Sequence, residues 1–133
     1  MSIAATDMED HCPFEWKADP GGSIRLDLST AIKAMVHDVE QDVSANLISA
    51  RFHNTVAQGL LAMAKLARDR TGLETVAISG GVFCNRYLAD RLIEWLTTAS
   101  FQVLWNRDVP TNDGGISTGQ AAIAASRRPC SGA

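Results

Sequence analysis

Two short glycine-containing segments carry the residues best suited to binding chemistry. The first is Ser79-Gly80-Gly81, which is followed four residues later by Asn85. Paired glycines let the backbone turn sharply and approach a ligand, because no Cβ atoms stand in the way. Backbone N–H groups, with the side-chain amide of Asn85, could then hold the phosphate of a nucleotide. The alternative is a tight turn whose glycines serve packing alone, and the local pattern leaves both interpretations open.

The second segment is Asn112-Asp113-Gly114-Gly115. In the functional interpretation, the Asp113 carboxylate is a ligand of a divalent metal that lies beside the phosphate. The alternative is ordinary Asn-Asp-Gly turn chemistry, with Asp113 capping the helix that follows. The nucleotide-binding candidates are therefore Ser79, Gly80, Gly81, Asn85 and Gly114, and the metal-binding candidate is Asp113.

Other familiar sites are not indicated. No Lys-Ser or Lys-Thr follows the first loop at the distance of a Walker motif, and the loop is not GxGxxG. The histidines form no HxxxH or HExxH pair, and His53 is interpreted as a partly buried residue satisfied by a neighbour. Three cysteines without CxxC spacing favour reduced thiols, with Cys84 packed and inert. The tryptophans Trp16, Trp95 and Trp105 are expected in a core or an interface.

Composition predicts one folded domain. The chain has 133 residues, 46% of them apolar, and a formal charge of −3. No basic patch favours nucleic acid or an anionic membrane as a partner. No apolar run approaches the roughly 20 residues of a membrane span, and residues 1–10 lack the pattern of a signal peptide. We therefore expect a soluble cytoplasmic protein.

The order of elements predicts an α/β domain. Residues 1–27 are expected to be an irregular lead-in with a short edge strand near 24–26, residues 28–126 the folded lobe, and 127–133 a flexible tail. Within the lobe, Ser29 and Ser44 are predicted to cap two helices. The second runs as far as Thr71-Gly72, and its apolar stripe consists of Leu47, Ile48, Phe52, Val56, Leu60, Met63 and Leu66. The remaining elements are strands at about 74–78 and 101–105 and, between them, a helix at about 85–98 with Leu88, Leu92, Ile93 and Leu96 on one face. A final alanine-rich helix permits close packing.

The two strands and their connecting helix should form a right-handed crossover unit. In such a unit the strands are parallel and their carboxyl ends lie at the same edge of the sheet. Both glycine segments come directly after these ends. The sequence thus predicts that the two candidate loops lie together.

Three segments, in this order, resemble the carboxy-terminal part of the HypF family, the carbamoyltransferases of [NiFe]-hydrogenase maturation. They are Ala50-Arg51-Phe52-His53-Asn54-Thr55, then 79–86 (Ser-Gly-Gly-Val-Phe-Cys-Asn-Arg), then 109–116 (Val-Pro-Thr-Asn-Asp-Gly-Gly-Ile). The similarity extends from about Ile24 to Ala125. A related pattern is found in O-carbamoyltransferases and in tRNA threonylcarbamoyladenosine enzymes.

The resemblance implies one lobe of an actin-like, sugar-kinase-like ATPase fold, whose βαβ units close over ATP with Mg. It also implies a reaction in which carbamoyl phosphate is cleaved and the carbamoyl group passes through an adenylate to the carboxy-terminal cysteine of HypE. By position, Gly80, Gly81 and Asn85 match the family's nucleotide loop. Asp113 matches a carboxylate that helps hold an active-site divalent metal, with Zn or Fe as candidates.

The chain also departs from the family pattern. The family's remaining metal ligands are histidines in an HxxxH arrangement in an upstream lobe, and this sequence has no substitute for them. Cys84 stands where a glutamine or a small residue is expected. We therefore expect a catalytically incomplete half of a nucleotide and metal cleft. The alternative is a non-catalytic interaction module that dimerises, or binds a maturation partner, through the surface left bare.

Overall fold

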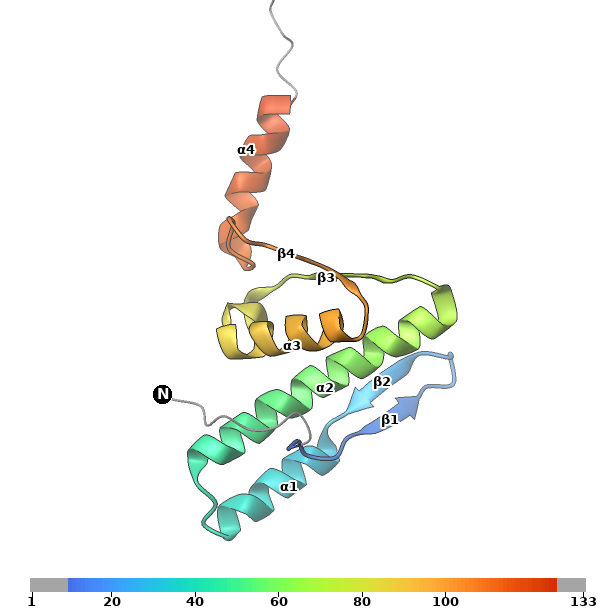
Figure 1. The fold of residues 1–133 in the computed structure, drawn as a ribbon, viewed down its shortest axis with the longest axis vertical. Coiled ribbons are helices and arrows are strands. Elements are labelled where there is room, and N and C mark those ends of the chain that lie inside the picture. Colours follow the sequence, from blue (N-terminus) through green and yellow to red (C-terminus); the bar gives the residue numbers. More distant parts are fainter. Residues whose placement is uncertain (1–9, 127–133) are drawn as a thin grey trace, which may run out of the picture.

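The computed structural model describes residues 10–126 and has the predicted α/β composition. Its elements, in chain order, are β1 (Glu15–Ala18), β2 (Ile24–Asp27), α1 (Ser29–Glu40), α2 (Ala45–Thr71), β3 (Thr75–Ile78), the 3-10 turn η1 (Gly81–Cys84), α3 (Arg86–Thr98), β4 (Gln102–Trp105), the 3-10 turn η2 (Asp113–Gly115) and α4 (Ile116–Ser126). Helix α2 separates α1 and the β1–β2 hairpin from α3 and the β3–β4 pair (Figure 1). The predicted tail, 127–133, lies outside the described residues.

The lead-in is more regular than the sequence suggested. The predicted strand near 24–26 is present as β2, and β1, which was not predicted, pairs with it in antiparallel register. At the end of β2 the Asp27 carboxylate accepts from the Ser29 backbone N–H at 2.9 Å and also forms an ion pair with Lys17. These contacts hold the pKa of Asp27 well below its usual range. The prediction that Ser29 caps α1 is therefore wrong, because Leu28 occupies the cap position and the carboxylate comes from Asp27.

Helix α2 ends as predicted, and its predicted stripe is only partly buried, with Val56 and Leu60 packed against the core. Gly72 adopts φ +72° and its N–H bonds to the Arg68 carbonyl, which closes the helix. The most buried apolar positions are small residues and Leu61, whereas Phe52, in the predicted stripe, is 39% exposed. The reason is that elements cover α2 from two sides. At Gly59 a Cβ atom would collide with the Leu26 side chain, so glycine lets the hairpin lie close to the helix.

The hydrophobic core lies between α2 and α3. Trp95 and Leu96 of α3 are almost fully buried, and they pack in one cluster with Leu61 and Phe101. The helix face predicted from Leu88, Leu92 and Leu96 is confirmed. Of the three tryptophans only Trp95 is buried. The core therefore fixes α3 beneath the β3–β4 pair.

The strands β3 and β4 are parallel, with Thr75 opposite Gln102 and Ile78 opposite Trp105, so the predicted crossover unit is confirmed. Helix α4 projects beyond this pair (Figure 1). All of its residues are exposed in the described part of the chain, including Ile116 and Ile123. The close packing expected for its alanines is therefore not seen here. No described helix combines the length and the apolarity that a membrane span needs.

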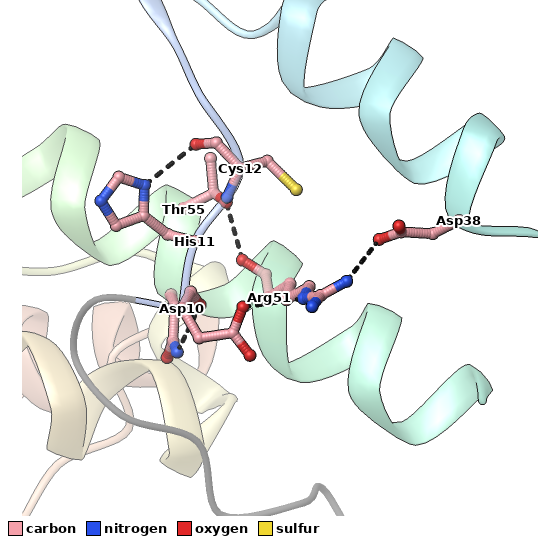
Figure 2. Close-up of polar contacts among 7 residues, drawn as sticks. Asp10, His11, Cys12, Asp38, Arg51 and Thr55 are labelled. Atoms are coloured by element: carbon pink, nitrogen blue, oxygen red, sulfur yellow. Dashed lines mark hydrogen bonds and ion pairs between the residues drawn. The ribbon is translucent and has the colours of Figure 1, made fainter. Parts of the chain in front are cut away.

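Polar contacts on α2 attach the segment before β1 (Figure 2). Arg51 donates to the carboxylates of Asp10 and Asp38 at 2.8 and 2.9 Å. The hydroxyl of the buried Thr55 accepts from the Cys12 N–H at 2.9 Å. Burial raises the pKa of the Cys12 thiol, so this cysteine is held as a neutral, inert group.

The fully buried Asn54 completes this arrangement. Its amide nitrogen donates to the Asp10 carbonyl at 3.1 Å, and its amide oxygen accepts from the Tyr87 hydroxyl at 3.3 Å. One side chain of α2 thus connects the amino-terminal segment with α3.

Replacing Asn54 with Ala should lower the free energy of unfolding by about 1–3 kcal/mol, because the Asp10 carbonyl and the Tyr87 hydroxyl lose a buried partner. Urea unfolding followed by circular dichroism measures the change. Asn46→Ala is the matched control, since Asn46 is exposed on the same helix and should shift stability by no more than about 0.5 kcal/mol. Equal effects of the two substitutions would contradict the structural role of Asn54.

Candidate functional site

The two candidate loops lie together at the carboxyl ends of β3 and β4, as the sequence predicted. The Gly80 N–H donates to the Thr111 carbonyl at 2.8 Å. The sulfur of Cys84 lies 3.6 Å from the Thr111 hydroxyl and accepts from the Asn112 amide at 3.5 Å. Residues 79–85 and 110–115 therefore form one continuous rim.

The first loop turns at Gly80, whose φ of +110° strongly favours glycine. The exposed Ser79 precedes this turn, and the Phe83 N–H bonds back to the Gly80 carbonyl at 3.1 Å. The helix after this loop was predicted at about 85–98, and this is confirmed, because α3 runs from Arg86 to Thr98 with Asn85 at its N-cap. The four-residue turn η1, which was not predicted, lies between the glycines and α3. The free N–H groups nearest the glycines accordingly belong to η1 rather than to α3.

Asn85 occupies the N-cap of α3. Its side-chain oxygen accepts from the Leu88 N–H at 3.2 Å, and its side-chain nitrogen lies 2.7 Å from Nε2 of His53. His53 is half-buried, and its Nδ1 lies 2.6 Å from the Ser49 carbonyl. The expectation that His53 is satisfied by its neighbours is confirmed, and one of these neighbours is a candidate site residue.

The second loop is organised by Asn112. Its side-chain oxygen accepts from the Gly114 N–H at 3.0 Å, so Asn112 caps the turn η2 that leads into α4. Asp113 itself lies exposed in η2. At Gly115 a Cβ atom would lie 2.7 Å from the Pro110 carbonyl oxygen, a distance that real Cβ contacts do not show. Glycine is thus needed at 115 for the chain to fold back on Pro110.

The described part of the chain does not offer a metal ion a complete set of ligands. Across residues 10–126 no three His, Cys, Asp or Glu side chains gather where they could hold an ion. Asp113 stands as a single carboxylate beside the rim. One monodentate ligand is too few for a structural or catalytic divalent site, so Asp113 cannot hold a metal unaided.

A cavity of about 330 Å³ lies against the rim, between α3 and the segment after β4. Its walls are mostly apolar, with Phe83, Trp105 and Ile93 among them, and Arg86 and Asn106 supply polar groups. Cys84 also lines it and is exposed, so the expectation of a packed thiol is wrong. Thr111 and Asn112 were not singled out in advance as site residues. The signal was available, since both follow a strand predicted to end at this edge.

Comparison with known proteins places these features in a family. Residues 1–120 match a family model described as "Carbamoyltransferase, Kae1-like Domain, second subdomain". The chain belongs to the HypF carbamoyltransferase family. It is 35% identical over 117 residues to carbamoyltransferase HypF2 of Cupriavidus necator, and 37% identical over 97 residues to carbamoyltransferase HypF of Synechocystis sp.. These alignments cover 88% and 73% of this chain.

Solved HypF structures share the fold. A crystal structure of full-length HypF in the phosphate- and nucleotide-bound form matches 92% of this chain with a TM-score of 0.80 and 39% identity. HypF of T. kodakarensis matches 86% with a TM-score of 0.62 and 23% identity. The chain spans only 14% and 12% of the two relatives above and 16% of the first structure. The described residues thus correspond to a small carboxy-terminal part of HypF.

The rim can be tested at its glycines. Gly115→Ala should lower stability by about 1–3 kcal/mol, because the new methyl group meets the Pro110 carbonyl oxygen and the loop must shift. The amide resonances of Gly80 and Thr111, recorded by two-dimensional NMR, should shift with it, since the two loops are bonded. Gly119→Ala in α4 is the control: nothing lies within 4 Å of that position, and the substitution should raise helix stability by up to about 1 kcal/mol. Unchanged resonances in Gly115→Ala would argue against a single rim.

Proposed function

We propose that this chain forms one half of the nucleotide cleft of a HypF-type carbamoyltransferase, on one lobe of an actin-like ATPase fold. The observation that carries the proposal is the joining of the two glycine loops by the bond from Gly80 to Thr111, at the carboxyl edge of a parallel strand pair. Ligands of α/β sheets bind at this edge. The similar full-length HypF structure is described as phosphate- and nucleotide-bound, which supports a nucleotide as the ligand proposed here.

In this proposal each residue of the rim has a binding role. Gly80 makes the turn, and Gly81 leaves an open backbone surface, since a Cβ there would touch only Asn112, at 3.8 Å. The phosphates of ATP, bound with Mg, accept from the backbone of the first loop and from Ser79 and Asn85. The backbone at Gly114 contributes from the second loop. A neutral cradle of N–H groups suits an anionic phosphate chain.

The reaction proposed for the intact protein uses ATP and carbamoyl phosphate to carbamoylate the terminal cysteine of a HypE-like acceptor. The thiolate of that acceptor would attack a carbamoyl adenylate held over the rim, and AMP would leave. Asp113 would contribute one ligand to a Zn or Fe site completed by an upstream lobe. No step of the chemistry is assigned to residues of this chain beyond binding and positioning.

Exposed apolar surface supports a partner for this lobe. Parallel sheets are normally covered on both faces, and Leu104 of β4 is 51% exposed here, as are Ile116 and Ile123 of α4 at similar levels. In the first proposal the upstream lobe covers this surface. The same observation favours a second candidate function, that of an interaction module which dimerises or binds a maturation protein without catalysis.

The carbamoyltransferase half and the interaction module are distinguished by adding the upstream part of a HypF protein. The chain mixed with the upstream portion of a HypF relative should give ATP-dependent carbamoylation of a HypE-like cysteine, read by intact-protein mass spectrometry. Full-length HypF serves as the positive control. Complex formation without carbamoyl transfer would favour the interaction module.

Nucleotide binding is tested in the same mixture by calorimetry with ATP and Mg²⁺. Gly81→Val should weaken binding at least about tenfold, because its side chain would occupy the surface that the phosphates need, while leaving the melting temperature nearly unchanged. Gly21→Val in the β1–β2 turn is the control, since Gly21 also has open space around it and lies outside the rim. Equal affinities for the two variants would overturn the assignment of the first loop.

A further inference from the structure

His53 lies on α2, in a different element from either candidate loop, yet it contacts the rim directly. Its ring packs edge-on against Tyr87 of α3, with ring centres 5.6 Å apart and planes at 83°. Its Nε2 atom lies 2.7 Å from the side-chain nitrogen of Asn85. The side chain is half-buried between the two helices, so its position is set by the same packing that fixes α3.

Two backbone groups determine how His53 and Asn85 share their hydrogens. The Ser49 carbonyl can only accept, so Nδ1 of His53, 2.6 Å away, carries the proton. In the neutral ring Nε2 then offers a lone pair. The Leu88 N–H can only donate, so the group of Asn85 that faces it at 3.2 Å is the amide oxygen. The amide nitrogen of Asn85 therefore faces His53 and donates to Nε2. The contact at Ser49 and the contact at Leu88 thus require the same orientation of the Asn85 amide.

We propose that His53 is a positioning residue for the nucleotide site: it holds the Asn85 amide so that the group left for a ligand is an N–H donor. One Nδ2 hydrogen of Asn85 bonds to His53, and the second bonds to nothing in the described part of the chain. With the amide turned by 180°, two donors would face each other at Leu88 and two acceptors would face each other at Nε2 of His53, and the N–H donor for a ligand would be lost. The orientation that His53 imposes thus favours an anionic ligand, such as a phosphate, over a cation. The proposal rests on the nucleotide site proposed above and adds the residue that orients the Asn85 amide in that site.

Two conservative substitutions separate the contacts of the ring. In His53→Gln the side-chain amide reaches the place of Nε2, and its oxygen can accept from Asn85. In His53→Asn the shorter amide can replace Nδ1 at the Ser49 carbonyl but cannot reach Asn85. Both variants keep a polar, uncharged residue at position 53. His53→Gln keeps the contact with Asn85 and gives up the one with Ser49, whereas His53→Asn does the reverse.

The contact is measured without any nucleotide, by NMR of the ¹⁵N-labelled 133-residue chain. The ring nitrogens of His53 should report a proton on Nδ1 and an accepting Nε2. The side-chain NH₂ resonances of Asn85 should move markedly in His53→Asn and stay closer to wild type in His53→Gln. A proton on Nε2 in the wild type, or Asn85 resonances that are the same in all three proteins, would overturn the proposal.

Nucleotide affinity is measured separately, with ATP and Mg²⁺, on each variant combined with the upstream portion of a HypF relative. We expect His53→Asn to weaken binding by about three- to tenfold, the worth of one misplaced hydrogen bond, and His53→Gln to restore most of it. Equal affinity in wild type and His53→Asn would refute the positioning role. Absence of binding in the wild type would instead refute the nucleotide site, while the NMR result would still decide whether His53 orients Asn85. Should His53→Asn fail to fold, the wild-type ring resonances and His53→Gln decide the same question.

Discussion

A buried side-chain amide must find its hydrogen-bond partners inside the protein, and Asn54 of α2 meets this requirement with groups from two other parts of the chain. It donates to the Asp10 carbonyl and accepts from the Tyr87 hydroxyl. The amino-terminal segment and α3 are therefore placed by the same residue. Asn85 of the first loop is also the N-cap of α3. The geometry of the rim therefore depends on the buried contact between Asn54 and Tyr87, which helps to place α3.

The neighbours of Asn54 in sequence extend this dependence. Arg51 joins Asp10 to Asp38, His53 contacts Asn85, and Thr55 receives the Cys12 N–H. Successive residues of a helix point in different directions, so one turn of α2 reaches α1, the amino-terminal segment and α3 at once. This turn is one of the three segments that resemble the HypF family. The structure gives a physical reason for the resemblance there, since nearly every side chain of the turn makes a tertiary contact.

Much of the architecture follows from patterns that the sequence shows locally. The end of α2 at Gly72, the core face of α3 and the shared edge of the two loops depend on glycine conformation, helical periodicity and the handedness of crossovers. The misses have a different origin. Ser29 is a good cap residue, but a carboxylate two residues earlier makes the contact. Phe52 fits an apolar stripe, but α2 is covered from two sides and buries its small residues instead. Strand β1 contains Glu15 and Lys17, and only its pairing with β2 gives it a strand's conformation. Local spacing could have pointed to Thr111 and Asn112, whereas the contact from His53 to Asn85 spans 32 positions and needs the fold.

Helix α2 contains 27 residues, which at about 1.5 Å per residue makes a rod roughly 40 Å long. The hairpin and α1 are attached along one side of this rod, and α3 along the other. A continuous helix without a proline or an internal break resists bending, so α1 and α3, which pack along α2, are held on one stiff support. A rotation of α2 would therefore carry α3, and with it Asn85 of the rim, along with the helix.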